Sequence, residues 1–339
     1  MSASLAAVVL AHDDPPKVGR LLAALDGVDI FLHCDRKTPA AILRQMLVRA
    51  GPRVCLVPRH RASLFSWSLV EAELDGLRLA LERSKAEHMI VLSGACYPLV
   101  SVAELEDELS SWRGLTRMQL DPLPYESWST PRNPDGGLWR FRRRFVTFRG
   151  QIVSVGGVPL RAYPRGIPPG LRLHASAHWK IYARDHAAAL LRILGERPDL
   201  VRFWRTTFVP EESCTGSILK SPALVGQVAE EIRDDLPWFM RWTGTGWHPA
   251  WLGEADFQAL ASARSAPARR PDQTVEPGAN HGRFRKLFAR KLSSRDSQLL
   301  EWIDAELRQQ PLMSDIPVPS RRASAPETRW RSASLPPGR

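Results

Sequence analysis

Short apolar runs alternate with amphipathic segments through the first 112 residues of the chain. The segments between the runs carry apolar residues at intervals of three and four, which is typical of helices with one buried face. This alternation predicts an α/β fold whose central sheet is mostly parallel and covered by helices on both faces. The predicted strands are Ala7–Ala11, Ile30–Cys34, Val54–Val57 and Met89–Leu92.

Capping residues and prolines indicate where the helices between these strands begin. A cap followed by proline, or a Ser and Glu three residues apart, satisfies the free N–H groups of a first helical turn. The last of these helices is expected over Val102–Trp112. The signals are Asp14 before Pro15-Pro16, Thr38 before Pro39, Ser68 with Glu71, and Ser101 with Glu104.

The rest of the chain is less regular. The stretch 115–172 is rich in prolines, glycines and aromatics, and it contains the basic cluster Trp139–Arg144. This cluster fits either an edge strand with one buried face or a site for an anionic polymer. Further helices are predicted at Arg184–Leu194, Pro210–Leu219 and Ser294–Leu307.

Composition and charge narrow the function classes. With 339 residues, 44% hydrophobic and 24% charged, the chain is ordinary globular protein. The 47 Lys and Arg against 36 Asp and Glu give a net charge of +11, which favours a nucleic acid, an anionic membrane surface or a phosphate-bearing small molecule as partner. The four cysteines have no CxxC spacing, so we expect neither a zinc site nor a disulfide framework. No apolar run is long enough for a signal peptide or a membrane span, so we expect a cytoplasmic protein.

Ligands of open parallel sheets bind at the carboxyl ends of the strands. The polar segments that follow the predicted strands are His12-Asp13, His33-Cys34-Asp35 and Ser93-Gly94. They are candidates for ligand binding, although residues of this kind also begin loops and cap helices.

The usual phosphate-binding motifs are missing from the sequence. It contains no GxGxxG after the first strand, no GxxxxGK[ST] and no DxD pair that would hold a metal ion against a diphosphate. A bound diphosphate would therefore need basic side chains. The segment Phe288-Ala289-Arg290-Lys291 supplies them, unless it is only a solvated basic turn.

Three other features could carry chemistry. Pro210-Glu211-Glu212 offers a general base, or simply the acidic first turn of a helix. His174 and His178 have helical spacing, but no third ligand accompanies them and we predict no metal site. Trp242 offers a flat face of the kind on which sugars stack, or a core residue.

Taken in order, these motifs resemble the Core-2/I-branching β-1,6-N-acetylglucosaminyltransferase family, whose relatives include peptide O-xylosyltransferases, in a compact bacterial-type form. The resemblance extends from about Val8 to Leu307. Its landmarks are Leu10-Ala11-His12, Leu32–Lys37, Ser66–Val70, Leu92–Leu99, Ser176–Trp179, Pro210–Glu212, Arg241-Trp242, His248-Pro249 and Leu287–Lys291.

The resemblance implies a GT-A-like fold and an inverting, metal-independent transfer from a UDP-sugar to a sugar or Ser hydroxyl. The family's general base falls on Glu212, and its diphosphate-binding lysine on Lys291. The acid that contacts uridine falls on Asp35, and an acceptor-stacking tryptophan on Trp242. Cys96 stands where bacterial relatives usually have Asp.

The resulting hypothesis is a glycosyltransferase that moves GlcNAc or xylose and needs no cofactor or divalent metal. Its predicted acceptor is a glycan, a lipid-linked sugar or a protein, without nucleic acid, and the +11 charge and Arg-rich tail suggest peripheral contact with the inner face of an anionic membrane. The alternative is a non-catalytic binding protein for anionic polysaccharide, membrane or nucleic acid. The predicted donor-binding residues are Ala11, His12, Asp35, Ser93, Gly94, Arg290 and Lys291, and the predicted acceptor-binding residues are Trp242, Arg140 and Glu211.

We predict one domain over residues 1–310. Its parts are a nucleotide-binding half over 1–112 and an acceptor and catalytic half over 113–310, with a mobile loop at 261–283. The Ser/Pro/Arg-rich segment 311–339 is expected to be a disordered tail.

Overall fold

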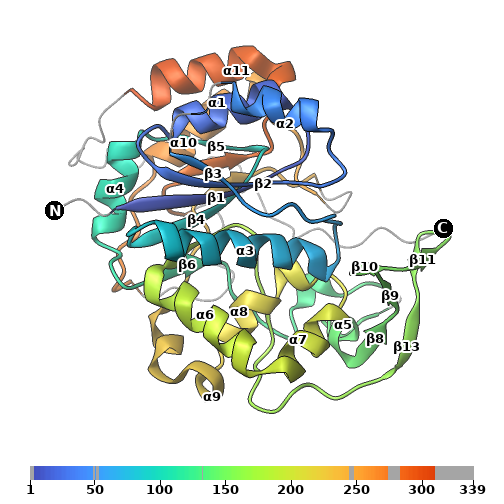
Figure 1. Cartoon of the computed structure of the whole chain (residues 1–339). Helices are drawn as coiled ribbons and strands as arrows, with labels where there is room; N and C mark the ends of the chain where they lie inside the picture. Colours follow the sequence, from blue (N-terminus) through green and yellow to red (C-terminus); the bar gives the residue numbers. More distant parts are fainter. Residues whose placement is uncertain are drawn as a thin grey trace.

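Seven strands form the central sheet, in the spatial order β16-β6-β15-β4-β1-β2-β3 (Figure 1). The structure is a computed structural model that describes residues 4–48, 50, 53–131, 133–243, 248–273 and 283–309. All neighbouring strands in this sheet run parallel except β15, which is antiparallel to both β4 and β6. The strands are β1 Leu5–Ala11, β2 Asp29–Cys34, β3 Val54–Leu56, β4 His88–Ser93, β6 Thr116–Met118, β15 Lys180–Ala183 and β16 Ile232–Asp234.

Helices cover both faces of this sheet. In Figure 1, α1, α2 and α11 lie above the sheet and α3, α6 and α8 lie below it. The helices are α1 Pro15–Ala24, α2 Ala40–Leu47, α3 Trp67–Arg83, α4 Val102–Ser110, α5 Trp139–Arg142, α6 Arg184–Glu196, α7 Pro198–Arg205, α8 Cys214–Leu219, α9 Pro222–Val225, α10 Phe257–Ser265 and α11 Ser297–Trp302. The predicted α/β class with a mostly parallel sheet is confirmed. None of the described helices is both long and apolar enough to cross a bilayer.

Smaller sheets surround the central one. The three-stranded sheet β17-β18-β5 brings residues near 290 beside residues near 96, and four two-stranded pairs complete the set. The additional strands are β5 Cys96–Pro98, β7 Asp121–Pro122, β8 Arg143–Phe145, β9 Thr147–Phe148, β10 Gln151–Ile152, β11 Ser154–Val155, β12 Val158–Pro159, β13 Arg161–Pro164, β14 His174–Ala175, β17 Trp238–Met240 and β18 Phe288–Arg290.

Short 3-10 and π turns complete the described elements. They are η1 Glu126–Trp128, η2 Pro210–Glu212, η3 Gly226–Glu231, η4 Glu254–Asp256, η5 Ser294–Asp296 and the π-helical η6 Ile303–Leu307. The helix predicted at Pro210–Leu219 is therefore divided into η2 and α8, and the one predicted at Ser294–Leu307 into η5, α11 and η6.

Two of the four predicted start signals were correct, those at Asp14 and Ser101. Thr38 does not cap α2, because the N-cap residue of that helix is Pro39 and the Thr38 hydroxyl donates to the His12 carbonyl at 2.6 Å. The Asp14 side chain accepts a hydrogen bond from the backbone N–H of Lys17 at the start of α1. Ser101 and Glu104 form the predicted capping box of α4, which ends at Ser110 rather than Trp112.

The Ser68–Glu71 capping box was wrong, because α3 already begins at Trp67 after an extended Ser66. Ser68 instead accepts a hydrogen bond from the backbone N–H of Ser63, and Glu71 forms an ion pair with Arg205. Both side chains are thus engaged by groups outside the first turn of the helix.

Two irregular segments also differ from expectation. Residues 261–265 of the predicted mobile loop belong to α10, because Leu260 and Arg264 are buried and anchor that helix. Residues 274–282 of this loop, and the predicted tail 311–339, lie outside the described residues. The basic cluster is a helical turn, α5, that leads into strand β8, so the predicted edge strand covers only its second part.

Candidate active site

The predicted donor-binding residues gather at the carboxyl ends of β1, β2 and β4. The backbone N–H of Gly94 donates to the Leu10 carbonyl, and that of Asp35 donates to the carbonyl of Ala11, each at 2.9 Å. Ala11 and Asp35 are buried, whereas the His12 side chain is 71% exposed. Asp35 accepts a hydrogen bond from the backbone N–H of Lys37 at 2.7 Å. These hydrogen bonds fix the positions of Ala11, Asp35 and Gly94 at this end of the sheet.

Strand β18 brings the basic motif to the same place. Arg290 is opposite Cys96 in the β18–β5 register, and its guanidinium donates to the Ser93 hydroxyl. The Lys291 carbonyl accepts from the backbone N–H of Leu252 at 2.8 Å. Burial, followed by the nearby charge of Arg290, lowers the pKa of Lys291 to about 8. The Arg290 guanidinium thus adjoins the Ser93-Gly94 turn, and the Lys291 ammonium lies 5.3 Å from the Trp251 ring centroid.

Cys96 is part of the internal support of this turn. It is buried, and its Sγ lies 3.4 Å from both the backbone N and the Oγ of Ser93. The buried Lys17 donates to the carbonyls of Gly94 at 3.2 Å and of Cys96 at 2.7 Å. This role of Lys17 could not be predicted from the sequence, because a lysine in the first turn of an amphipathic helix normally faces solvent.

The two adjacent glutamates of η2 have different environments. Glu211 is buried, and its Oε1 accepts the backbone N–H of Phe65 at 2.8 Å. Burial and the charge of Glu212 raise the pKa of Glu211 to about 8. The Glu212 side chain is 39% exposed, and its Oε2 lies 3.6 Å from Nη1 of Arg140. Burial raises the pKa of Glu212, and Arg140 opposes that rise. Only Glu212 is open to a ligand while paired with a cation.

Arg140 is placed to hold Glu212. It is only 3% exposed, and its guanidinium carbon lies 3.9 Å from the ring centroid of Trp128. Its prediction as an acceptor ligand stays a prediction. Trp242 is half-buried and packs against the hydrophobic core, so its proposed stacking face also stays a prediction.

A cluster of buried charged side chains lies between η2, which carries Glu211 and Glu212, and Arg290. Glu73 lies within α3 and is 0% exposed. Its carboxylate is 3.4 Å from the Lys180 ammonium, 3.1 Å from His178 Nε2 and 2.7 Å from the Tyr182 hydroxyl. The positive charge of Lys180, like that of Arg140, opposes the rise in the pKa of Glu212. The Glu73 cluster therefore acts on the charge of the predicted base through Lys180.

The other end of this cluster reaches Arg290. The His178 ring stacks on Trp179 with 4.6 Å between ring centroids, and the Arg290 guanidinium lies 4.2 Å from the Trp179 ring centroid. In addition, the backbone N–H of Ser176 donates to the Glu212 carbonyl at 2.7 Å. Segment 176–180 therefore contacts both halves of the candidate site.

His248 is another residue near both halves. Its ring stacks on that of Phe65 with 6.5 Å between centroids. Burial, then the charges of Lys291 and Arg290, lower the pKa of His248. Phe65 in turn holds Glu211 through its backbone N–H. In the sequence, His248 is marked only by its place in the His248-Pro249 landmark of the resemblance.

The histidine pair does not form a metal site. His174 belongs to β14 and bonds to the carbonyl of Arg172, whereas His178 pairs with Glu73, so the two rings have separate partners. Across the described ranges, no cluster of three or more His, Cys, Asp or Glu is arranged to hold a metal ion.

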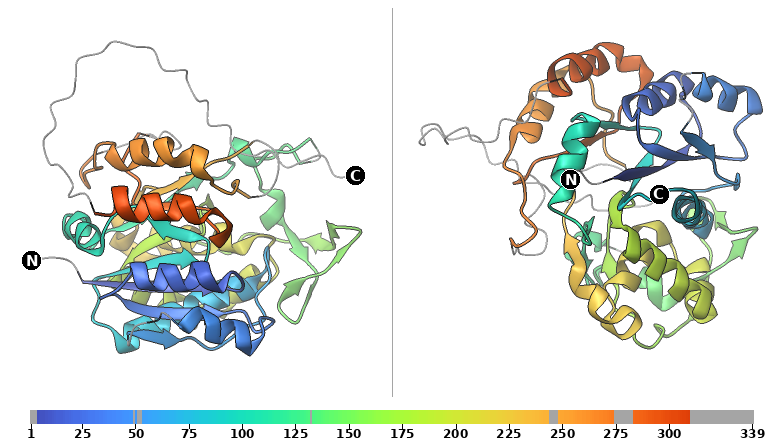
Figure 2. Two further views of the ribbon diagram at one scale, coloured as in Figure 1. Left: turned by 90° about the horizontal axis from the view of Figure 1, so that it is seen from above. Right: turned by 60° about the vertical axis from the view of Figure 1, so that its left-hand side comes forward.

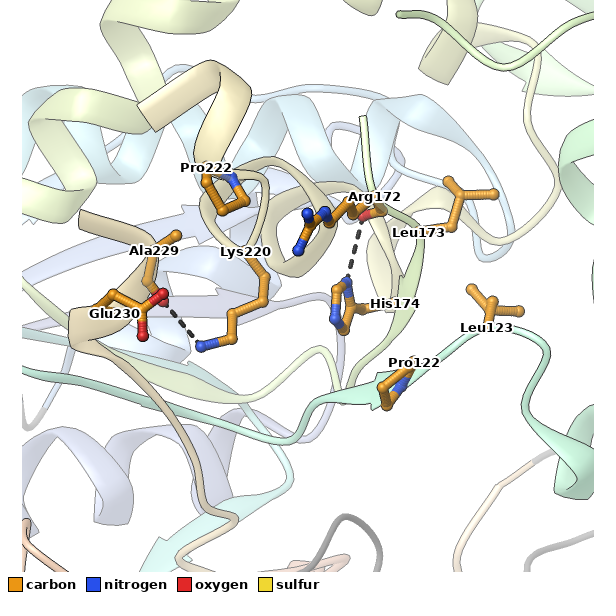
Figure 3. A pocket seen from close by; sticks show the side chains of 9 residues that line it. All are labelled: Pro122, Leu123, Arg172, Leu173, His174, Lys220, Pro222, Ala229 and Glu230. Carbon is orange, nitrogen blue, oxygen red and sulfur yellow. Dashed lines mark hydrogen bonds between the residues drawn. The ribbon is translucent and has the colours of Figure 1, made fainter. Parts of the chain in front are cut away.

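A separate cavity of about 430 Å³ lies between β7, β14 and the α8–α9 region (Figure 3). Lys220 crosses it and donates to the Ala229 carbonyl at 2.8 Å. None of the predicted site residues lines this cavity. We therefore place the candidate active site at the strand ends and η2.

Comparison with known proteins agrees with the motifs. No curated protein matches the chain. Among solved structures, a protein assigned as a glucose-1-phosphate thymidylyltransferase from Bacillus anthracis, in complex with sucrose, is 11% identical with a TM-score of 0.28, over 55% of this chain and 74% of that one. HddC from Yersinia pseudotuberculosis is 13% identical with a TM-score of 0.27, over 55% and 79%. At these TM-scores, neither likeness carries an argument. The model of the Core-2/I-branching enzyme family matches residues 6–260. The chain therefore belongs to the Core-2/I-branching enzyme family.

Proposed function

We propose that the protein is an inverting, metal-independent glycosyltransferase that uses a UDP-sugar donor. Membership of the family supports a glycosyltransferase in general. The observation that carries the finer proposal is the placement of a half-exposed glutamate and two adjacent cations on the two sides of segment 176–180. A general base and support for a departing diphosphate are the two groups that such a reaction needs.

Glu212 acts as the general base in this proposal. Its carboxylate takes the proton of the acceptor hydroxyl while that oxygen forms a bond to the anomeric carbon. The bond from this carbon to the diphosphate oxygen breaks, its electron pair leaves with UDP, and the anomeric configuration inverts. Arg140 opposes the rise that burial causes in the pKa of Glu212 and so favours its ionised form, whereas the buried Glu211 remains protonated at neutral pH because its pKa is about 8.

Lys291 and Arg290 stabilise the negative charge that develops on the diphosphate. Fixed cations in a partly buried site contribute most where charge appears in the transition state. A lysine with a pKa of about 8 still carries its proton at neutral pH. The Ser93-Gly94 turn and Arg290 then contact the phosphates, while Ala11, His12 and Asp35 line the uridine end.

The acceptor approaches Glu212 from the open side of η2. We assign Trp242 to stacking on the acceptor sugar, while the buried Arg140 and Glu211 act through their contacts with Glu212 and Phe65. The transferred sugar is GlcNAc or xylose, and the acceptor is a glycan, a lipid-linked sugar or a Ser hydroxyl of a protein.

The decisive experiment compares Glu212→Gln with Glu211→Gln. Saturation-transfer NMR against a panel of UDP-sugars first selects the donor, and UDP release is then measured with acceptor present. We expect Glu212→Gln to lower turnover by about 10²–10⁴-fold with UDP affinity changed less than twofold. Glu211→Gln should retain most activity, because glutamine resembles the protonated acid. Normal turnover of Glu212→Gln would refute the assigned base.

Excess EDTA tests the other half of the proposal. Because Lys291 and Arg290 are assigned the role of the metal, the rate should not change when EDTA is added. A strict requirement for Mn²⁺ or Mg²⁺ would refute this account of the leaving group.

A further inference from the structure

A β-rich extension projects from the body of the protein beside the candidate site. It comprises residues 142–167 and includes strands β8 to β13, at the right of Figure 1 and again at the edge of the molecule in Figure 2. Backbone hydrogen bonds such as Val146 N to the Leu160 carbonyl, at 2.9 Å, tie its hairpins together. The extension therefore consists of hairpins that are hydrogen-bonded to one another.

Its surface is unusually apolar for an exposed element. Of the eleven large hydrophobic side chains that are exposed among the described residues, seven belong to this extension. Contiguous exposed apolar side chains of this kind mark an interaction surface. They are Val146, Phe148, Val155, Val158, Leu160, Tyr163 and Ile167, with Phe148 and Val155 each 65% exposed.

The same surface is strongly cationic. No Asp or Glu occurs between Asp135 and Asp185 in the sequence. The arginines lie against aromatic rings instead of carboxylates: the guanidinium carbon of Arg144 is 5.4 Å from the Tyr163 ring centroid, and that of Arg149 is 5.2 Å from the Phe148 ring centroid. The exposed arginines of the extension are Arg142, Arg143, Arg144, Arg149 and Arg161.

The mixture of groups distinguishes between anionic partners. A nucleic acid or polysaccharide would use the arginines and rings, but it offers nothing to the aliphatic side chains. Val155 and Val158 face each other across the turn formed by Gly156 and Gly157, whose φ angles of 56° and 76° permit a tight hairpin. An apolar hairpin tip on an element that also carries exposed arginines matches the interface of an anionic bilayer, where acyl chains lie directly beneath phosphate headgroups.

We propose that residues 142–167 form a docking surface for an anionic phospholipid bilayer. The tip at Val155 and Val158 enters the region between headgroups and acyl chains, and the arginines bind lipid phosphates. Charge complementarity and the exposed aliphatic tip together select this occupant.

The extension is also joined to the glutamate turn. Phe145 of β8 packs on Phe208, with 5.4 Å between ring centroids, and Val209 of the same cluster precedes η2. In addition, the backbone N–H of Ile152 donates to the Ser66 hydroxyl at 2.9 Å, at the start of α3. Docking would therefore hold Glu212 close to the membrane surface. Only this consequence, access to a lipid-linked acceptor, rests on the proposed function.

Vesicle flotation of the full-length protein tests the docking surface without any sugar donor. The probes are phosphatidylcholine vesicles with and without phosphatidylglycerol. The test variant is Arg149→Glu with Val155→Ser. Its matched control is Arg44→Glu with Val48→Ser, the same changes at an exposed pair on and just after α2, where Val48 is 80% exposed. Unchanged thermal unfolding shows that each variant is folded.

We expect the wild-type protein and the control to bind phosphatidylglycerol vesicles, and the test variant to bind about tenfold more weakly or worse. Because all three proteins have the same C-terminal segment, any binding by that segment cancels from the comparison. Equal binding of test and control variants would overturn the proposal. This result would leave the glycosyltransferase assignment untouched, because transfer is measured separately.

A second variant separates lipid from other polyanions. Val155→Ser alone keeps every charge and should weaken vesicle binding severalfold while leaving binding to heparin or single-stranded RNA unchanged. If the wild-type protein binds these polymers but not vesicles, or if Val155→Ser binds vesicles normally, the extension is not a bilayer-docking surface.

Discussion

Replacing Glu211 with glutamine tests whether the Glu211 carboxyl is neutral in the folded protein. Its Oε1 accepts the backbone N–H of Phe65, and its buried Oε2 has no hydrogen-bond partner among the described residues. Burial and the adjacent Glu212 raise its pKa from 4.5 to about 8. Between these two pH values, the folded protein holds one more proton at this site than the unfolded chain does. The free energy of unfolding must therefore fall as the pH rises through this window.

The size of the effect follows from the two pKa values. At about 1.4 kcal/mol per pKa unit, the linkage between pH 5 and pH 8 amounts to about 3–4 kcal/mol. Glutamine carries no titrating proton, so Glu211→Gln should gain this amount relative to the wild-type protein over the same interval. Lys17 and Lys291 have lowered pKa values of about 7 and 8 and act in the opposite direction. Their effect is common to both proteins and cancels in the difference.

Urea unfolding followed by tryptophan fluorescence at pH 5 and pH 8 measures this difference. Glu254→Gln is the control, because Glu254 is an exposed glutamate on the surface turn η4. The free energy of unfolding of Glu211→Gln minus that of the wild-type protein should be larger at pH 8 than at pH 5. The same difference for Glu254→Gln should be equal at the two pH values. If the Glu211→Gln values also stay parallel, Glu211 is ionised in the folded protein and its assignment as the neutral partner is wrong.

Three further predictions concern other contacts. Lys291→Arg should move the alkaline decline of kcat/KM from about pH 8 to higher pH, because burial and Arg290 no longer remove the charge; an unmoved limb would contradict the role of Lys291. Gly76→Ala should lower the free energy of unfolding by about 1–3 kcal/mol, because a Cβ at residue 76 would lie 2.3 Å from Cγ1 of Val8. Adding Val8→Ala to this variant should recover part of the loss in urea unfolding. Strict additivity of the two effects would contradict this contact. Glu73→Gln should lower the free energy of unfolding by about 3–5 kcal/mol, because Lys180 would remain buried without its counter-charge. The loss should be smaller in the double variant that also carries Lys180→Met. A loss below about 1 kcal/mol in the single variant would contradict the ion pair.

The strands and helices of the first half could be predicted because their signals are local. The apolar run of β1 and the Asp14 cap of α1 depend on residues within one or two turns of each other. The capping box predicted at Ser68 was wrong because its side chains have partners outside the first turn of the helix. Glu71 bonds to Arg205, a residue distant in sequence, and that partner cannot be inferred from a capping spacing.

The candidate site was predicted residue by residue, but its assembly was not. Glu212, Arg290 and Lys291 were found from their motifs, since chemistry restricts which side chains can act as base or bind phosphate. The pairing of Arg290 with Cys96 requires β18, from late in the chain, to become the central strand of the small sheet β17-β18-β5. Such pairing depends on the complete fold, because strand register is set by packing that involves all neighbouring elements.

The chain's periodicity and motifs were sufficient for the α/β class and the Core-2/I-branching enzyme family, and they select the side chains that the proposed reaction uses. The division of labour between Glu211 and Glu212, and the buried Glu73 cluster beneath them, emerged from the folded arrangement. The physical reason is that burial and neighbouring charges set the ionisation of a carboxyl group. For Glu73, three polar partners from one segment distant in sequence, residues 178–182, converge on a helix position that otherwise resembles a solvent-facing one.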